Sequence, residues 1–137
     1  MKSVETLIKL AKHKVDSVQK LIMAAQKIEE DLLKKLQDLD AQVAKEGKIA
    51  ELNHEYIASY NQFKKSVEVQ KANVYNSLEG VKAQLLALAD ELKIAFEEQK
   101  KFETLHERRL AKALENRKAR ELKSMDEFAI TRMKRAN

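Results

Sequence analysis

The first part of the chain carries an apolar residue at every third or fourth position. From Val4 to Val43 the steps alternate between four and three, and only Glu29 interrupts the apolar character. The members of this stripe are Val4, Ile8, Ala11, Val15, Val18, Ile22, Ala25, Glu29, Leu32, Leu36, Leu39 and Val43. Such spacing places one narrow apolar stripe along a helix and is typical of a left-handed coiled coil. Ser3 and Glu5 fit the N-cap and the first turn of this helix.

The stripe stops close to a glycine. Gly47 can adopt the left-handed conformation that closes a helix. Asn53 and Glu55 can cap a new helix a few residues later. The sequence therefore predicts a first helix over about residues 3–46 and a hairpin tip over residues 47–53.

A second stripe with the same two steps follows the tip. Its members are Tyr56, Tyr60, Phe63, Val67, Gln70, Val74, Leu78, Val81, Leu85, Leu88, Leu92, Ala95, Gln99 and Phe102. Two steps of four meet at Val74, shortly before Gly80, which predicts a local irregularity without a break. The second helix is predicted over about residues 54–130. Two narrow stripes with a short connection pack antiparallel, which would bring Val4 close to Ala95.

The composition favours long helices over a globular core. Of the 137 residues, 36% are charged and 5% are aromatic, and the chain has two glycines and no proline. Alanine, leucine, lysine, glutamate and glutamine lose little rotamer freedom in a helix. Because the chain has no cysteine, a disulfide is excluded and a reducing cytoplasm is allowed. The predicted fold is all-α: a long antiparallel two-helix coiled-coil hairpin with a C-terminal helical extension, in a single coiled-coil domain over residues 1–137.

The positive charge is concentrated beyond the predicted paired stem. From about residue 103 the second helix outruns the first, and its apolar residues no longer keep a regular step. Residues 107–137 hold ten Lys and Arg against five acidic residues, which accounts for the whole net charge of +5. A projecting basic helix favours an acidic partner surface through contacts that weaken with salt. Met125 and Phe128 are further contact candidates, unless the tail folds back onto the stem.

No set of residues supports a catalytic, cofactor or metal site. His54-Glu55 and His106-Glu107 look like the start of a zinc-binding helix motif, but no second histidine follows at the required spacing. There is no glycine-rich phosphate loop and no nucleophile with a base and an orienting group. No apolar run approaches the roughly 20 residues that a bilayer crossing needs. We therefore expect a soluble, non-enzymatic protein without a cofactor.

Three short segments carry a family resemblance. A basic helix over Glu115 to Lys123 leads into the sequence Met125-Asp126-Glu127-Phe128-Ala129. Val4 to Ala11 and the sequence Tyr60-Asn61-Gln62-Phe63 are the other two segments. In this order the three segments resemble the C-terminal motif, the N-terminal pattern and the opening of the second helix in FliJ proteins of the bacterial flagellar type III export apparatus.

The resemblance implies specific partners. FliJ proteins are cytoplasmic coiled coils that sit in the pore of the hexameric export ATPase, link it to the cytoplasmic domain of the membrane export gate, and bind export chaperones. By this resemblance the chain is a stalk that stimulates the ATPase and couples it to the gate. It would work at the cytoplasmic face of the inner membrane export apparatus, peripheral to the membrane through its partners only.

The resemblance also suggests which residues make the contacts. The candidate ATPase contacts are Arg108, Arg109, Lys112, Arg117, Lys118, Arg120, Lys123, Met125, Asp126, Glu127 and Phe128. The candidate gate contacts are Phe63 and Val67. Family members carry tyrosines late in the first helix at the gate surface, and residues 42–46 of this chain contain none.

Other functions share some of these features. An injectisome stalk, or a generic coiled-coil scaffold or secretion chaperone, uses the same physics and differs only in its partner. A nucleic-acid binder could neutralise phosphates with the ten basic residues of the tail. Basic-zipper proteins place the basic region before a continuing zipper, whereas here the order is reversed and five acidic residues are interspersed. A protein partner is therefore favoured over nucleic acid.

Overall fold

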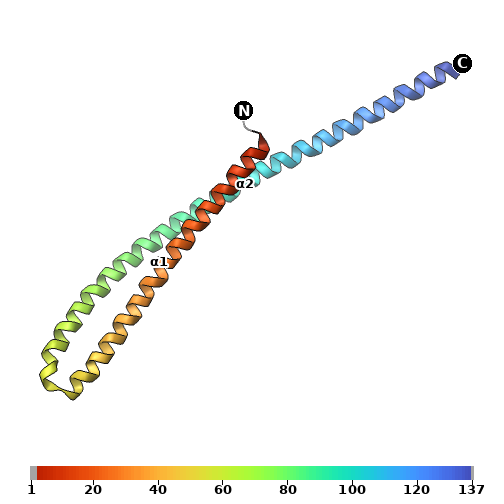
Figure 1. Cartoon of the computed structure of the whole chain (residues 1–137). Coiled ribbons are helices and arrows are strands. Elements are labelled where there is room, and N and C mark those ends of the chain that lie inside the picture. Colours follow the sequence, from red (N-terminus) through yellow and green to blue (C-terminus); the bar gives the residue numbers. More distant parts are fainter. Residues whose placement is uncertain (1–2, 137) are drawn as a thin grey trace. The chain divides into compact units, whose positions relative to one another are not determined.

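The computed structural model describes residues 3–136, which form two long helices joined by a short turn (Figure 1). Helix α1 spans Val4–Leu52, the 3-10 helix η1 spans His54–Tyr56, and helix α2 spans Ile57–Ala136. No residue in the described range 3–136 belongs to a strand. The predicted all-α helical hairpin is confirmed.

The helices pack in two compact units. The hairpin unit comprises Val15–Ile94, and the terminal unit joins residues 3–14 to residues 95–136. In the hairpin unit α1 and α2 run antiparallel beside each other (Figure 1). Its tightest cluster contains Val18, Ala25 and Leu88, with Ile22, Leu85 and Leu92 packed around them. In the terminal unit the start of α1 packs against α2, and Ala11 and Ala95 are buried there.

The apolar stripe predicted for the first helix is the face that the structure buries. Every member of the stripe is buried or half-buried, Glu29 included. The alternating steps continue through Glu46 to Ala50, which are also withdrawn from solvent. The predicted cap at the start of α1 is confirmed, because Ser3 Oγ accepts a hydrogen bond of 3.2 Å from the backbone N–H of Thr6.

Helix α1 continues to Leu52, beyond the predicted end at residue 46. Gly47 is helical, and no glycine in the described chain has a positive φ. Its role is close approach: a Cβ atom at position 47 would lie only 2.9 Å from Tyr60 Oη and 3.3 Å from Tyr60 Cζ. The missing side chain therefore lets an aromatic ring from α2 pack against the backbone of α1.

Asn53 makes the turn between the two helices. Its backbone is extended, with φ −139° and ψ 103°, and its side-chain oxygen accepts a hydrogen bond of 3.2 Å from the backbone N–H of Glu55. The N–H of Asn53 donates to the carbonyl of Ile49 at 3.1 Å, and the N–H of Tyr56 donates to the carbonyl of Asn53 at 3.1 Å. The predicted cap at Asn53 is confirmed, and the turn is shorter and later than the predicted tip.

The later turn shifts the pairing of the two helices. In the terminal unit one hollow is lined by Leu7, Leu10, Ala11, Lys14, Glu98 and Phe102. The prediction that Val4 lies close to Ala95 is therefore wrong. Because Ala11 and Phe102 line the same hollow, the antiparallel register directs Val4 to a part of α2 beyond Phe102 instead of back to Ala95. When the turn of a hairpin moves by one residue along the chain, the residue that lies opposite a given position changes by two.

The prediction that Gln70 belongs to the second stripe is also wrong. Gln70 is exposed, whereas Lys71 is half-buried and its ammonium pairs with Asp40 on α1. Two steps of four therefore meet at Val67 instead of Val74. The methylene stem of Lys71 covers the seam while its charged end reaches the carboxylate at the seam's edge. The hydrogen bond with Asp40 raises the pKa of the Lys71 ammonium.

Replacing Gly80 by alanine should stabilise the protein. Helix α2 is continuous through Gly80, and a Cβ atom there would meet nothing within 4 Å. Because alanine is the better helix former, the free energy of unfolding should rise by about 1 kcal/mol. Gly47→Ala is the matched control, since its methyl group would press on the Tyr60 ring and cancel the gain. Urea unfolding followed by circular dichroism measures both variants, and equal midpoints for the two would contradict this assignment.

Candidate functional site

The C-terminal end of α2 is exposed at every residue from Glu107 to Ala136 (Figure 1, blue). At about 1.5 Å per residue this stretch, which we call the tail, is about 45 Å long. It begins later than the predicted extension from residue 103, because Glu103, Thr104 and His106 are still half-buried in the terminal unit. Within the terminal unit, residues 3–14 do not cover the tail.

The predicted ATPase contacts all lie on the exposed tail, but they do not share one face. At about 100° per residue, Arg109, Arg120 and Lys123 project to one side of the helix. Met125 and Phe128 project to the opposite side. One side of the helix is therefore mainly basic and the other mainly apolar, with Lys118 and Arg132 on the apolar side.

Interactions within the tail are weak and leave its side chains available. Arg117 Nε lies 3.8 Å from Glu121 Oε1, one helical turn away, and both side chains are exposed. Exposed pairs of this spacing contribute about 0.3 to 0.5 kcal/mol. Thr131 Oγ1 donates a hydrogen bond of 2.9 Å to the carbonyl of Glu127. A partner could recruit Arg117 at little cost to the helix.

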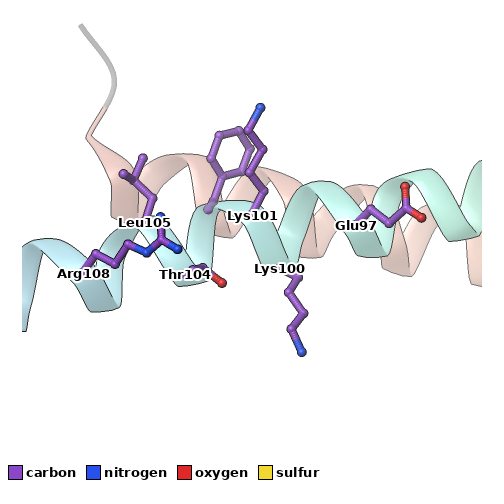
Figure 2. Close-up of a pocket in the computed structure, with 7 residues that line it drawn as sticks. Glu97, Lys100, Lys101, Thr104, Leu105 and Arg108 are labelled. Carbon is purple, nitrogen blue, oxygen red and sulfur yellow. The ribbon is translucent and has the colours of Figure 1, made fainter.

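A hollow of about 470 Å³ lies at the start of the tail (Figure 2). It is lined by Glu97, Lys100, Lys101, Phe102, Thr104, Leu105 and Arg108. Figure 2 shows Lys100 and Lys101 pointing to opposite sides of α2, so their charged groups do not converge. Small-molecule sites need a few convergent polar groups. The apolar stripes do not predict this hollow, because most of its lining residues lie outside them.

The two predicted gate contacts lie in the seam of the hairpin unit. Phe63 is half-buried, and Val67 is only 2% exposed. Val67 therefore packs in the seam while α1 and α2 are paired, and its contact with the gate stays a prediction. Beside Phe63, Lys64 Nζ lies 5.4 Å from the centre of the Tyr60 ring. Phe63 keeps more exposed surface than Val67.

Comparison with known families decides what kind of protein carries this tail. The family model described as flagellar FliJ protein matches residues 1–137, the whole chain. The chain belongs to the FliJ family. The resemblance of its three segments is thereby confirmed, and this FliJ-family chain is a component of the flagellar export apparatus. A search of curated proteins and a search of solved structures each gave no match.

Two further observations describe the surface of this FliJ-family chain. None of the described helices is long and apolar enough to cross a membrane. Within residues 3–136, histidine, aspartate and glutamate side chains do not gather in groups of three or more that could hold a metal ion.

The Tyr56 phenol of this FliJ-family chain should ionise at a higher pH than an ordinary tyrosine. Its hydroxyl donates a hydrogen bond to Glu46 Oε2, and this bond raises the pKa of Tyr56 above the usual value. The bond therefore stabilises the fold below the ordinary tyrosine pKa, and its contribution is lost as the pH rises through the raised pKa. Ultraviolet titration of phenolate, in a background with Tyr60→Phe and Tyr75→Phe, measures the midpoint. Glu46→Gln should lower that midpoint, and an unchanged curve would argue against the bond.

Proposed function

We propose that this FliJ-family chain is a non-enzymatic stalk that binds the hexameric export ATPase through its tail and stimulates it. The observation that best supports this is the continuous exposure of a helix with a basic face and an apolar face from Glu107 to Ala136. A helix of this length with no intramolecular partner is suited to docking into a groove of another protein. Membership of a flagellar export family supports an export component as that protein.

Electrostatics favours an acidic docking surface. The tail carries the whole net charge of the chain, +5, while the remaining residues are balanced. A concentrated charge of one sign speeds the encounter with a surface of the opposite sign and makes the affinity depend on ionic strength. The stimulation of the ATPase should therefore weaken as salt is added.

The packed helices supply the mechanical part of the proposal. A two-helix stem with a continuous apolar seam resists bending better than one helix, so it can transmit force between the ATPase and the cytoplasmic domain of the export gate. Phe63 is the more exposed of the two candidate gate contacts in the hairpin unit. The protein also binds export chaperones and reaches the membrane only through its partners, at the cytoplasmic face of the export apparatus.

The ATPase rate of the export ATPase from the same species tests the proposal. Adding the full chain should raise the rate and saturate at a fixed ratio of chain to hexamer, and an unrelated coiled coil of similar charge should not. Binding to duplex DNA is measured in parallel at the same salt. No binding to the ATPase would overturn the proposal, and tight DNA binding in its place would assign the tail to nucleic acid.

A further inference from the structure

The apolar face of the tail lies on a different side of α2 from the seam that packs against α1. In the terminal unit the seam runs through Ala95, Gln99, Phe102 and His106, which are buried or half-buried. Continuing its steps of three and four leads to Arg109, Ala113, Asn116, Arg120, Lys123, Glu127, Ile130 and Lys134. Most of these residues are polar. The tail therefore does not continue the seam. If α1 were longer, it would meet mostly polar residues on this side of α2.

A separate row of large apolar side chains begins where the seam ends. We call it the tail stripe, and its members are Leu110, Leu114, Leu122, Met125, Phe128 and Met133. At about 100° per residue they fall within an arc of about 140°. Every member of the stripe is exposed, and the same arc also holds Ala111, Ala129 and five charged residues: Glu107, Glu115, Lys118, Glu121 and Arg132. A row of exposed large apolar side chains on one side of a helix is typical of a docking face.

Charged residues lie along both edges of this stripe. Arg108 lies just outside one edge, and Arg117 and Arg135 lie just outside the other. Glu121 is an acidic residue on this side of the helix, and its Oε1 atom lies 3.8 Å from Arg117 Nε. A surface that receives the stripe would meet guanidinium groups on both sides, and such groups favour carboxylate partners.

We propose that the tail stripe docks into an apolar groove rimmed by carboxylates on the export ATPase, with Lys118 fixing its register against a further carboxylate in the groove. This inference rests on the proposed function and adds the face of the helix that binds and the chemistry of the surface that receives it.

Lys118 interrupts the tail stripe at its middle. It lies one turn from Leu114 and one turn from Leu122, on the same face. A lysine that is buried without a partner loses its hydration, so a groove that accepts this face needs an acidic group opposite it. A polar residue within an apolar seam can fix the register of two helices, and Lys118 is the one that lies between two leucines of the stripe, each one turn away.

A second copy of this chain fits the tail stripe poorly. Residues 107–121 hold six basic residues against three acidic ones, and residues 122–136 hold four against two. Both halves of the tail are basic, so parallel and antiparallel pairing of two tails would each bring like charges together.

An anionic membrane surface also fits the tail stripe less well than an acidic protein groove. Phe128 is the single aromatic residue of the stripe, and interfacial helices rely on such anchors. Glu121 within the arc and Asp126 at its edge would approach the anionic headgroups. These two carboxylates would meet negative charge in an acid-rimmed groove as well, so the lack of further aromatic anchors is what disfavours the membrane.

Two matched substitutions test the face that binds. Leu122 lies in the tail stripe and is 63% exposed, whereas Ile130 lies on the continuation of the seam and is 55% exposed. The affinity of the full chain for the purified hexameric export ATPase is measured for wild type, Leu122→Ala and Ile130→Ala. Leu122→Ala should weaken binding about tenfold, and Ile130→Ala should change it less than about twofold. Circular dichroism confirms equal helix content.

The outcomes separate this inference from the proposed function. If the wild-type chain binds and the two substitutions have equal effects, the tail stripe is not the docking face, although the proposed function stands. If the wild-type chain does not bind the ATPase, the proposed function fails and the inference with it. Vesicles containing anionic lipid are a second probe: binding that depends on Leu122 to vesicles alone would overturn the protein groove.

The register is tested by Lys118→Leu and Lys118→Glu in the same assay. If a carboxylate faces Lys118, both variants should bind at least about tenfold more weakly, because each leaves that carboxylate without its partner. If the groove is wholly apolar at this point, Lys118→Leu should bind more tightly than wild type, which would overturn the proposed pairing.

Discussion

A chain cut after His106 should lose at least about a hundredfold in affinity for the export ATPase and should no longer stimulate it. The cut removes all ten basic residues of the tail together with the tail stripe. It removes none of the residues that are buried or half-buried between α1 and α2. The truncated chain should therefore unfold at the same temperature as the full chain but no longer bind the ATPase. This result would separate binding from folding.

The salt dependence and a shorter truncation complete this test. The affinity of the full chain should fall as salt rises, while any residual binding of the truncated chain should be nearly independent of salt. A chain cut after Ile130 keeps most of the tail stripe and loses only Arg132, Lys134 and Arg135 among the basic residues. It should retain much of the affinity. Undiminished stimulation by the chain cut after His106 would mean that the ATPase contacts another surface.

The seam was predictable because its periodicity is local, whereas the role of Gly47 was not. In sequence a glycine near the end of a stripe can be either a left-handed cap or a site of close approach. The choice depends on the Tyr60 ring of the other helix, a contact that exists only once the helices are paired. One local signal pointed the right way: the heptad steps continue through Glu46 to Ala50.

The misplaced seam position in α2 has a similar origin. Gln70 and Lys71 are both polar, so hydropathy alone cannot choose between them. Asp40 on α1 selects Lys71 through an ion pair, and that selection depends on a register set by the turn. Val67 shows the same dependence on pairing, since a residue that fits the seam so well is buried by it, and its contact with the gate stays a prediction.

The candidate tail residues were found from their charge, but their division into faces needed the helix. Steps of three and four lead from the seam onto the basic side. The tail stripe begins with a step of four from Leu110 to Leu114, on another side of the helix. Only a continuous helix through residues 107–136 turns these spacings into two opposite surfaces. Which partner each surface meets depends on a second protein, and the sequence of one chain does not contain that information.

Replacing Val18 by aspartate should destabilise the hairpin unit by about 3 to 5 kcal/mol. Val18 is 1% exposed and packs with Ala25 and Leu88 at the tightest point of the seam. A carboxylate there would lose its hydration without gaining a partner, and burial would raise its pKa. The loss should therefore shrink as the pH falls below that raised pKa, because the protonated side chain is less costly to bury.

Met23→Asp is the matched control, because Met23 lies on the same helix and is 68% exposed. It should change the free energy of unfolding by less than about 0.5 kcal/mol. Urea unfolding monitored by circular dichroism, at neutral and at acidic pH, measures both variants. Equal destabilisation by the two would place the seam on another face of α1. If only Val18→Asp lowers the free energy of unfolding, and it also abolishes ATPase stimulation, the action of the tail depends on the packed helices. The reason is that an isolated helix of the tail's length is only marginally stable in water.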